Sequence, residues 1–233
     1  MLILGLDSSA KAASSAVYDT DSNTLIAYGG VNVKITHSET LLPLVESVLE
    51  AAKLNLSSIG AFAVTAGPGS FTGVRIAAGA VKGMAFALGL PVYPVSTLRC
   101  LAYNLIGRDC AVCCVMDARR GQFYNALFRI KGQKVIRLTP DSALCTAEIE
   151  DELRICESEK IILAGDGAEL FLSETKLLNV ECAPVTLIHQ SAASVCLAAA
   201  EEKPVSAKEL IPIYLRLPQA ERERKYHKEG VQL

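Results

Sequence analysis

The feature that most constrains the fold of this chain is a pattern that occurs twice, 110 residues apart. An apolar run ends at Asp7 and is followed by two further β-like runs, and a second apolar run ends at Asp117 and is followed by two more. Later in each half, a strand-like segment ends in a glycine-rich turn, AGPG at 66–69 and AGDG at 164–167. Two repeated features in the same order predict an internal duplication.

Each copy is expected to contain a meander of three strands, then a helix, a strand and a helix. Strands are predicted at 2–7, 15–19, 25–33, 60–66 and 91–95 in the first half, and at 111–116, 122–130, 134–138 and 161–164 in the second. Helices are predicted at 38–53, 72–88, 96–106, 146–156 and 191–201. Pro43 suggests that the first helix begins near Thr40, because proline is tolerated only in a first turn. Ser96 is the expected cap of the third.

The predicted fold class is therefore a two-lobe α/β protein with a duplicated strand-strand-strand-helix-strand-helix unit and mixed sheets. We expect residues 1–108 to form the first lobe and 109–233 the second, with a tail from about residue 212 that packs back on the first lobe. Strand ends of both lobes would meet at one cleft, the usual place for a ligand. The candidate cleft residues are Asp7, Ser8, Ser9, Asp117, Arg119 and Asp166. Aspartate and serine at a strand end also satisfy turn backbone, so a purely structural role stays open.

Composition and charge restrict the class of protein. Hydrophobic residues make up 51% and charged residues 21%, and the formal charge of -2 gives no overall attraction to nucleic acid. The start of the chain has no basic residue before its apolar run, so we expect no secretion signal. The charge-free stretch between Lys82 and Arg99 is too short and too interrupted by glycine and proline to span a bilayer. We therefore expect a soluble, cytoplasmic protein without a membrane partner.

Other chemistry finds little support in the sequence. The eight cysteines lie mostly in apolar segments, and Cys110 and Cys113 fall on an expected strand, where residues three apart point to opposite faces. The three histidines are too scattered for a zinc cluster, and no GxSxG motif is present. The charged run at 221–228 is typical of a solvated tail.

The turn before the second helix, GPGSFTG at 67–73, and the small residues that follow it can face a phosphate, this chain's own sheet or another protein. Backbone N–H groups at a helix start can bind phosphate, but there is no GxxxxGK[ST] loop, since Lys82 is far along the helix. Arg75 in the first turn is unfavourable for the helix dipole, which predicts a carboxylate or phosphate partner. Small residues recur every three or four positions and permit another backbone, of this chain or of a partner, to come close. They are Gly73, Ala77, Ala80, Gly83 and Ala87.

Four strings make the chain resemble one bacterial family: LGLDSS at 4–9, HSETLLP at 37–43, the stretch 66–98, and IPIYLR at 211–216. They resemble the TsaB (YeaZ) family, which is similar to TsaD and Kae1, proteins once classed as glycoproteases. The resemblance is specific to about residue 101 and looser beyond. It implies the fold of the actin, Hsp70 and sugar-kinase superfamily. It also implies a role in making threonylcarbamoyladenosine in tRNA, as a non-catalytic scaffold and activator of TsaD, with TsaE as an ATP-binding subunit.

The resemblance also implies which residues act. The catalytic sibling carries a metal-binding H-x-x-x-H pair where this chain has Thr97 and Leu101. No cofactor is therefore expected on the chain by itself; ATP or ADP and metal would come through partner subunits, and tRNA only through the complex. Two first-lobe helices would form the homodimer and the heterodimer with a TsaD-like paralogue. The implied contact residues are His37, Leu41, Leu44, Val45 and Val48 on one helix, and Gly73, Arg75, Ala77, Ala80, Gly83 and Ala87 on the other. A metal-dependent peptidase and a sugar-kinase-type ATPase are the alternatives.

Overall fold

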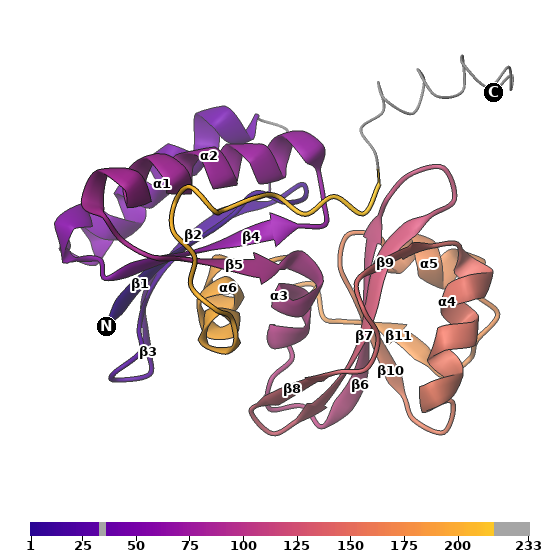
Figure 1. The fold of residues 1–233 in the computed structure, drawn as a ribbon. Coiled ribbons are helices and arrows are strands. Elements are labelled where there is room, and N and C mark those ends of the chain that lie inside the picture. Colours follow the sequence, from indigo (N-terminus) through magenta and orange to yellow (C-terminus); the bar gives the residue numbers. More distant parts are fainter. Residues whose placement is uncertain (33–35, 217–233) are drawn as a thin grey trace, which may run out of the picture.

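Two mixed β-sheets stand side by side in the computed structural model, which describes residues 1–32 and 36–216 (Figure 1). The first sheet contains β1 (Leu2–Asp7), β2 (Ala13–Asp19), β3 (Thr24–Val31), β4 (Ala61–Gly67) and β5 (Val92–Ser96). The second contains β6 (Cys110–Asp117), β7 (Phe123–Lys131), β8 (Lys134–Arg137), β10 (Ile161–Ala164) and β11 (Val180–Cys182), and β9 (Ser142–Leu144) pairs with β7. The charged run 221–228 lies outside the described residues.

The two sheets have the same topology. The order is β3-β2-β1-β4-β5 in the first and, in corresponding positions, β8-β7-β6-β10-β11 in the second. In each, the central strand pairs antiparallel with the next strand of the meander and parallel with the strand that follows a helix. The predicted duplication is therefore present, and the predicted class, a two-lobe α/β fold with mixed sheets, is confirmed.

The helices form an outer layer on each sheet and a shared layer between the sheets (Figure 1). They are α1 (His37–Ala51), α2 (Phe71–Leu88), α3 (Thr97–Tyr103), α4 (Thr146–Leu153), α5 (Ala168–Glu174) and α6 (Ala192–Ala198). Helices α1 and α2 cover the first sheet, and α4 and α5 cover the second. Helix α3 follows β5 and packs on β6 and β7 of the second sheet as well as on β4 and β5, whereas α6 follows β11 but packs on β1 and β2. One hydrophobic core consequently joins residues of both lobes.

The observed elements differ from the prediction in the start of α1, in the lengths of α3 and α6, and in a few short elements that were not predicted. Helix α1 begins at His37 and not near Thr40, because Thr36 accepts the Glu39 N–H at its carbonyl (3.0 Å) and donates its hydroxyl to the Glu39 carboxylate (2.7 Å). These contacts keep a first turn before Pro43 helical. Helices α3 and α6 are shorter than predicted, although Ser96 caps α3 as expected by accepting the Arg99 N–H at 3.2 Å. Three short elements, α5, β9 and β11, were not predicted.

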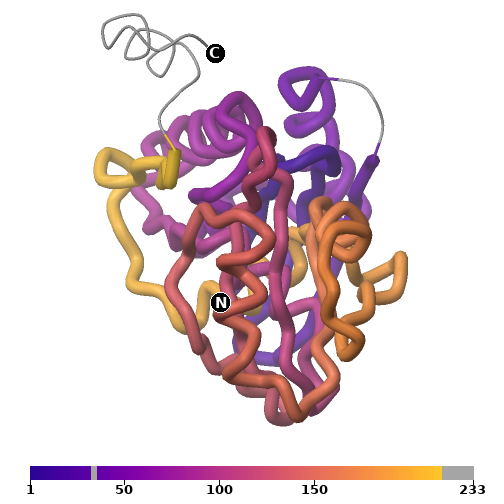
Figure 2. The backbone as a smooth tube through the Cα atoms, turned by 90° about the vertical axis from the view of Figure 1, so that its right-hand side faces the viewer, coloured from indigo at the N-terminus to yellow at the C-terminus, as the bar shows by residue number. Residues whose placement is uncertain are grey.

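The C-terminal segment returns to the first lobe earlier than the expected residue 212. After α6, the Val92 N–H donates to the Val205 carbonyl at 2.9 Å, Leu210 is buried in the first-lobe core, and the Ile213 N–H donates to the Ala66 carbonyl at 2.6 Å. Figures 1 and 2 show this segment running along the first lobe toward the start of α2. Helix α6 packs on β1 and β2 and covers the inner face of the first sheet, so in space it belongs to the first lobe and the second lobe ends before it.

Two further expectations concern apolar segments. Helix α2 is the one helix in the described part of the chain that is long and apolar enough to cross a membrane. Its packing on β4 accounts for this composition, because a helix that covers a sheet is apolar on one side. All eight cysteines are free. Cys110 and Cys113 lie on β6, as predicted for cysteines with a structural role, and burial raises the pKa of the Cys113 thiol.

Candidate functional site

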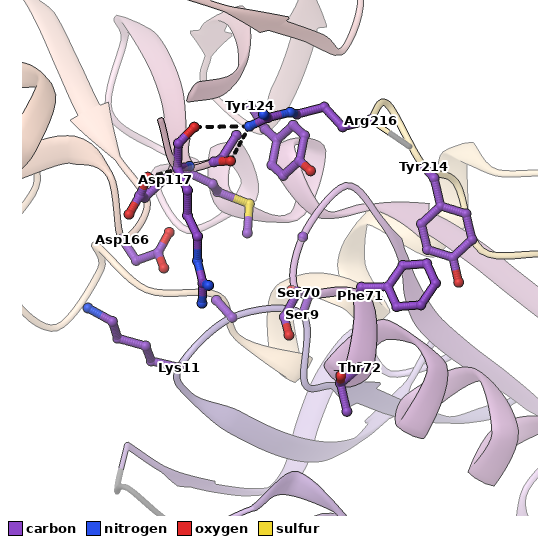
Figure 3. Close-up of a pocket in the computed structure, with 15 residues that line it drawn as sticks. Ser9, Lys11, Ser70, Phe71, Thr72, Asp117, Tyr124, Asp166, Tyr214 and Arg216 are labelled. Carbon is purple, nitrogen blue, oxygen red and sulfur yellow. Dashed lines mark hydrogen bonds between the residues drawn. The ribbon is translucent and has the colours of Figure 1, made fainter. Parts of the chain in front are cut away.

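A cleft of about 470 Å³ opens between the lobes, at the ends of β1 and β6 (Figure 3). The loop after β1, the start of α2, the loop after β6, Asp166 and the C-terminal segment form its walls. Four of the predicted cleft residues line it: Ser9, Asp117, Arg119 and Asp166. Lys11, Tyr214 and Arg216 also line the cleft and were not predicted as site residues.

The two strand-end aspartates make the same local turn. The Ser9 N–H donates to Asp7 Oδ1 at 3.3 Å, and the Arg119 N–H donates to Asp117 Oδ1 at 2.6 Å. Each carboxylate therefore fixes the loop that leaves its strand, which is a common use of aspartate in turns. The duplication extends to the glycine turns, where Gly67 has φ +114° and Gly165 has φ +117°. Only glycine adopts such angles readily.

Asp7 and Ser8 lie beneath the cleft and not in its wall, so their predicted place in the cleft is wrong. Both are fully buried. Asp7 Oδ1 accepts hydrogen bonds from Ser9 Oγ and Thr65 Oγ1, each at 2.6 Å, while Oδ2 has no partner. Burial raises the pKa of Asp7, and the two hydroxyl groups oppose that rise. Ser8 Oγ donates to the Gly73 carbonyl at 2.8 Å.

The glycine turn before α2 and the first turn of that helix pack closely against two other segments of the chain, the loop after β1 and the C-terminal segment. The Ser70 N–H donates to the Ser9 carbonyl at 2.7 Å, and Ser70 Oγ accepts the Gly73 N–H at 3.3 Å as the cap of the helix. A Cβ on Gly73 would lie 1.9 Å from the Ser8 carbonyl oxygen, and a Cβ on Gly67 would lie 2.3 Å from that of Ile213. The small residues at this end of α2 are thus required by the loop after β1 and by the C-terminal segment.

The cleft carries charges of both signs. Lys11 extends toward Asp166 in Figure 3. Burial raises the pKa of Asp166, whereas the positive charge of Lys11 opposes the rise, and Asp166 Oδ1 has no hydrogen-bond partner. Arg119 and Arg120 have φ of 63° and 59°, in the left-handed region that is uncommon for residues other than glycine. The cleft is therefore lined by three basic side chains, Lys11, Arg119 and Arg216, and by the carboxyl groups of Asp117 and Asp166, a set that suits a ligand with both anionic and polar groups.

The C-terminal segment ties the two lobes together across the cleft. The Tyr214 ring lies 4.8 Å from the Phe71 ring, and Arg75 Nε donates to the Tyr214 hydroxyl at 2.8 Å. The Arg75 guanidinium also lies 3.7 Å from the centre of the Phe71 ring. Within the chain, Arg75 is therefore held by the Phe71 and Tyr214 side chains, and a carboxylate or phosphate partner stays a prediction. Arg216 donates to the carbonyl groups of Ala118 and Arg119 in the second lobe (Figure 3).

Known proteins match this chain over most of its length. A family model described as "TsaD: tRNA N6-adenosine threonylcarbamoyltransferase" matches residues 14–222. The tRNA threonylcarbamoyladenosine biosynthesis protein TsaB of Bacillus subtilis is 30% identical over 95% of this chain and 96% of its own length. The chain belongs to the TsaB (YeaZ) family. The Escherichia coli TsaB is 29% identical over 93% of the chain and 95% of its own length. The structure of YeaZ from Pseudomonas aeruginosa matches 92% of the chain and 99% of that protein with a TM-score of 0.76 and 26% identity.

The TsaB resemblance assigned a partner interface to α1 and α2, and the structure divides those residues into two groups. Five are buried in the first-lobe core and cannot reach a partner, which corrects the prediction: Leu41, Val45, Val48, Gly73 and Ala77. Four of them belong to the helix faces that pack on the sheet, and Gly73 faces the loop after β1. The others reach the surface in part or fully: His37, Leu44, Arg75, Ala80, Gly83 and Ala87. His37 Nε2 hydrogen-bonds the Ala10 carbonyl at 2.6 Å, so part of its ring is used within the chain.

Thr97 and Leu101, the positions at which the resemblance implies a histidine pair in the catalytic sibling, do not line the cleft of this TsaB-family chain. Thr97 and Leu101 are fully buried in α3. Neither side chain is a useful metal ligand. Within residues 1–32 and 36–216, no three His, Cys, Asp or Glu side chains gather in an arrangement suited to one metal ion.

Proposed function

We propose that this chain takes part in the biosynthesis of threonylcarbamoyladenosine in tRNA, as a non-catalytic scaffold and activator of a TsaD-like transferase. Family membership supports the pathway, because the TsaB relatives are named for it. The observation that carries the scaffold role is the outer surface of α2. Here small residues make no contact within the chain, although the helix bears them at a cost in stability.

The outer surface of α2 is built for a close approach by another backbone. A Cβ on Gly79 or Gly83 would meet no atom within 4 Å, and Ala87 beside them is exposed. Each glycine inside a helix costs about 1 kcal/mol relative to alanine, so the isolated chain gains nothing from it. A second helix gains, because small residues let two axes approach closely. Phe86, with 70% of its surface exposed, supplies an apolar side chain of the kind that anchors protein interfaces.

The absence of catalysis by this chain alone rests on its side chains. Transfer of a carbamoyl group from an adenylate needs charge stabilisation at the leaving phosphate, from a metal ion or preorganised donors. Thr97 and Leu101 cannot contribute as ligands. We therefore assign ATP or ADP and metal to TsaD-like and TsaE-like partners, and tRNA binding to the assembled complex.

Reconstitution tests the proposal. Unmodified tRNA, threonylcarbamoyl-adenylate and ATP are incubated with TsaD-like and TsaE-like subunits, with and without this chain. We expect modification only when this chain and the transferase are both present. Gly83→Leu should weaken association with the TsaD-like subunit at least tenfold, whereas Glu169→Leu on α5 of the other lobe should not. Threonylcarbamoyl transfer by this chain alone, or full activity without it, would refute the proposal.

A sugar-kinase-type ATPase is the second candidate, and the cleft itself favours it. Lys11, Arg119 and the start of α2 line one cavity, and basic side chains at a helix start can bind phosphate. Calorimetry with magnesium and ATP on the isolated chain distinguishes the two functions. Tight nucleotide binding with hydrolysis favours the ATPase, and no heat at millimolar nucleotide favours the scaffold.

A further inference from the structure

The loop after β6, residues 118–122, has an unfavourable backbone conformation. Arg119 (φ 63°), Arg120 (φ 59°) and Gly121 (φ 67°) follow one another in the left-handed region, where a residue with a Cβ is strained. The corresponding loop after β1, residues 8–12, has the same length and contains no residue with a positive φ. The turn made by the strand-end aspartate is common to both loops. Neither loop length nor this turn therefore explains the left-handed conformation, and another contact must hold it.

The contact that differs between the two loops is a side chain from the C-terminal segment. Arg216 Nη1 donates to the carbonyl groups of Ala118 and Arg119, to the latter at 3.0 Å (Figure 3). In the first lobe, the carbonyl at the corresponding position is that of Ser9, and it accepts the Ser70 N–H at 2.7 Å. The loop after β1 is thus held by its own lobe. The loop after β6 is held by a segment that packs on the other lobe.

Residues 211–216, the part of the C-terminal segment that carries this side chain, are lightly attached. In the described part of the chain, their one backbone hydrogen bond to another segment runs from the Ile213 N–H to the Ala66 carbonyl at 2.6 Å. Ile211 is 70% exposed and Ile213 is 47% exposed. A segment with few buried contacts opens at a lower free energy than the rest of the fold.

Tyr214 connects this segment to α2. Its ring lies 4.8 Å from the Phe71 ring, and its hydroxyl accepts a hydrogen bond from Arg75 Nε at 2.8 Å. Arg75 is exposed and forms no ion pair with any described residue. A carboxylate on a bound partner can pair with this guanidinium in place of the neutral hydroxyl, because charge-assisted hydrogen bonds are stronger. A partner on the outer surface of α2 would then withdraw Arg75 from Tyr214.

We propose that residues 211–216 form a latch that couples the outer surface of α2 to the loop after β6. When the latch is docked, Arg216 keeps the loop left-handed and Arg119 in the wall of the cleft. When a partner carboxylate pairs with Arg75, Tyr214 is released and the latch leaves the loop. The strained loop then relaxes and moves its arginine, so partner and latch favour different states of the cleft. Only the partner step rests on the proposed function.

Hydrogen exchange followed by mass spectrometry tests the coupling on the full chain, through peptides that cover residues 118–122. The Ala118 N–H donates to the Gln122 carbonyl at 3.0 Å, and the Arg119 N–H is also hydrogen-bonded, so their exchange reports opening of the loop. Arg216→Met should speed this exchange about fivefold, the effect of one lost hydrogen bond. Arg216→Lys should retain most of the protection, because an ammonium group can also donate to two carbonyls.

The decisive variant changes the contact on the first lobe. Tyr214→Phe keeps the ring beside Phe71 but removes the acceptor for Arg75, and it should speed exchange of the loop about twofold or more. Because Tyr214 acts through Arg216, the double variant with Arg216→Met should exchange no faster than Arg216→Met alone. Arg154→Gln removes an exposed arginine of the second lobe and is the control that should leave the loop unchanged.

Unchanged loop exchange in Tyr214→Phe, or additive effects in the double variant, would overturn the latch. A uniform loss of protection throughout the second lobe would overturn it too, because it would assign Arg216 to general stability. A further arm adds the TsaD-like subunit. We expect its binding to speed exchange of the loop, and Arg75→Gln, whose loop already exchanges faster, to show no further rise. A bound subunit that leaves the loop unchanged would overturn the partner step, whereas a subunit that does not bind counts against the proposed function.

Discussion

Two glycines on the same helix should respond to alanine in opposite directions. Gly73 and Gly83 both lie inside α2, so helix propensity alone favours alanine at each by about 1 kcal/mol. A Cβ on Gly83 meets nothing within 4 Å, so the gain should appear in full. A Cβ on Gly73 lies 1.9 Å from the Ser8 carbonyl oxygen, a backbone atom at the end of a buried strand. Relief of that overlap costs about 1–3 kcal/mol.

The net change at Gly73 also includes a hydrogen bond. Displacement of the loop after β1 disturbs the bond from Ser8 Oγ to the Gly73 carbonyl (2.8 Å), worth about 1 kcal/mol. With the propensity gain subtracted, Gly73→Ala should destabilise the chain by about 1–3 kcal/mol. Gly83→Ala should stabilise it by about 1 kcal/mol, which for a chain of this size raises the melting temperature by about 2–4 °C.

Urea and thermal unfolding followed by circular dichroism measure both variants against the parent chain. Shifts of the same sign would refute the reasoning, because they would mean that both glycines face the same environment. A stable Gly73→Ala variant, in particular, would show that the loop after β1 does not need a glycine at the start of α2. A destabilised Gly83→Ala variant would show that the outer surface of α2 is occupied in the isolated chain, for instance by a second copy.

Three further outcomes follow from other contacts. Burial raises the pKa of Asp7, so above about pH 4 the folded chain keeps a proton on this carboxyl group that the unfolded chain releases. The free energy of unfolding of the parent chain therefore falls as the pH rises through that window. Asp7→Asn lacks this titration, so urea titrations should show its stability, relative to the parent, increasing with pH above about 4. Tyr214→Ala removes an aromatic pair worth about 1 kcal/mol and should speed trypsin cleavage after Arg216 about fivefold. Burial raises the pKa of the Cys113 and Cys114 thiols, so iodoacetamide at pH 8 should label them only after unfolding, as read by mass spectrometry.

The fold was largely predictable because its strongest signals are local and repeated. The aspartates that end β1 and β6, and the glycine turns that follow β4 and β10, indicated two copies of one unit. Elements of three to seven residues, such as β11 and α5, carry too few residues for a period to be recognised. The start of α1 was wrong because the prediction gave Pro43 more weight than the contact between Thr36 and Glu39.

The site was predictable only where a residue's role depends on its own strand end. Asp117 is the last residue of β6, Arg119 lies two residues beyond it, and both line the cleft. Asp7 was misplaced because its burial is a tertiary property: it lies in the core against Thr65, a residue 58 positions away that donates its hydroxyl to Asp7 Oδ1. Tyr214 and Arg216 were not named as site residues because they reach the cleft from a segment far along the chain. The spacing of small residues in α2 was likewise visible in the sequence. It did not show that Gly73 contacts the loop after β1 while Gly83 lies on the outer surface of the helix.

The exchange of inner helices between the lobes determines how the chain can be divided. A fragment ending at residue 108 would keep α3 but lose its partners β6, β7 and α6, with only β4 and β5 left to pack on it, and would lack α6, which covers β1 and β2. The fit is tight enough that a Cβ on Gly5 would lie 2.4 Å from Cys196 Sγ. Neither half can therefore serve as an autonomous folding unit, and opening of the cleft by a hinge would require α3 and α6 to slide past each other. Motions that adapt the cleft to a ligand are thus confined to its loops and the C-terminal segment.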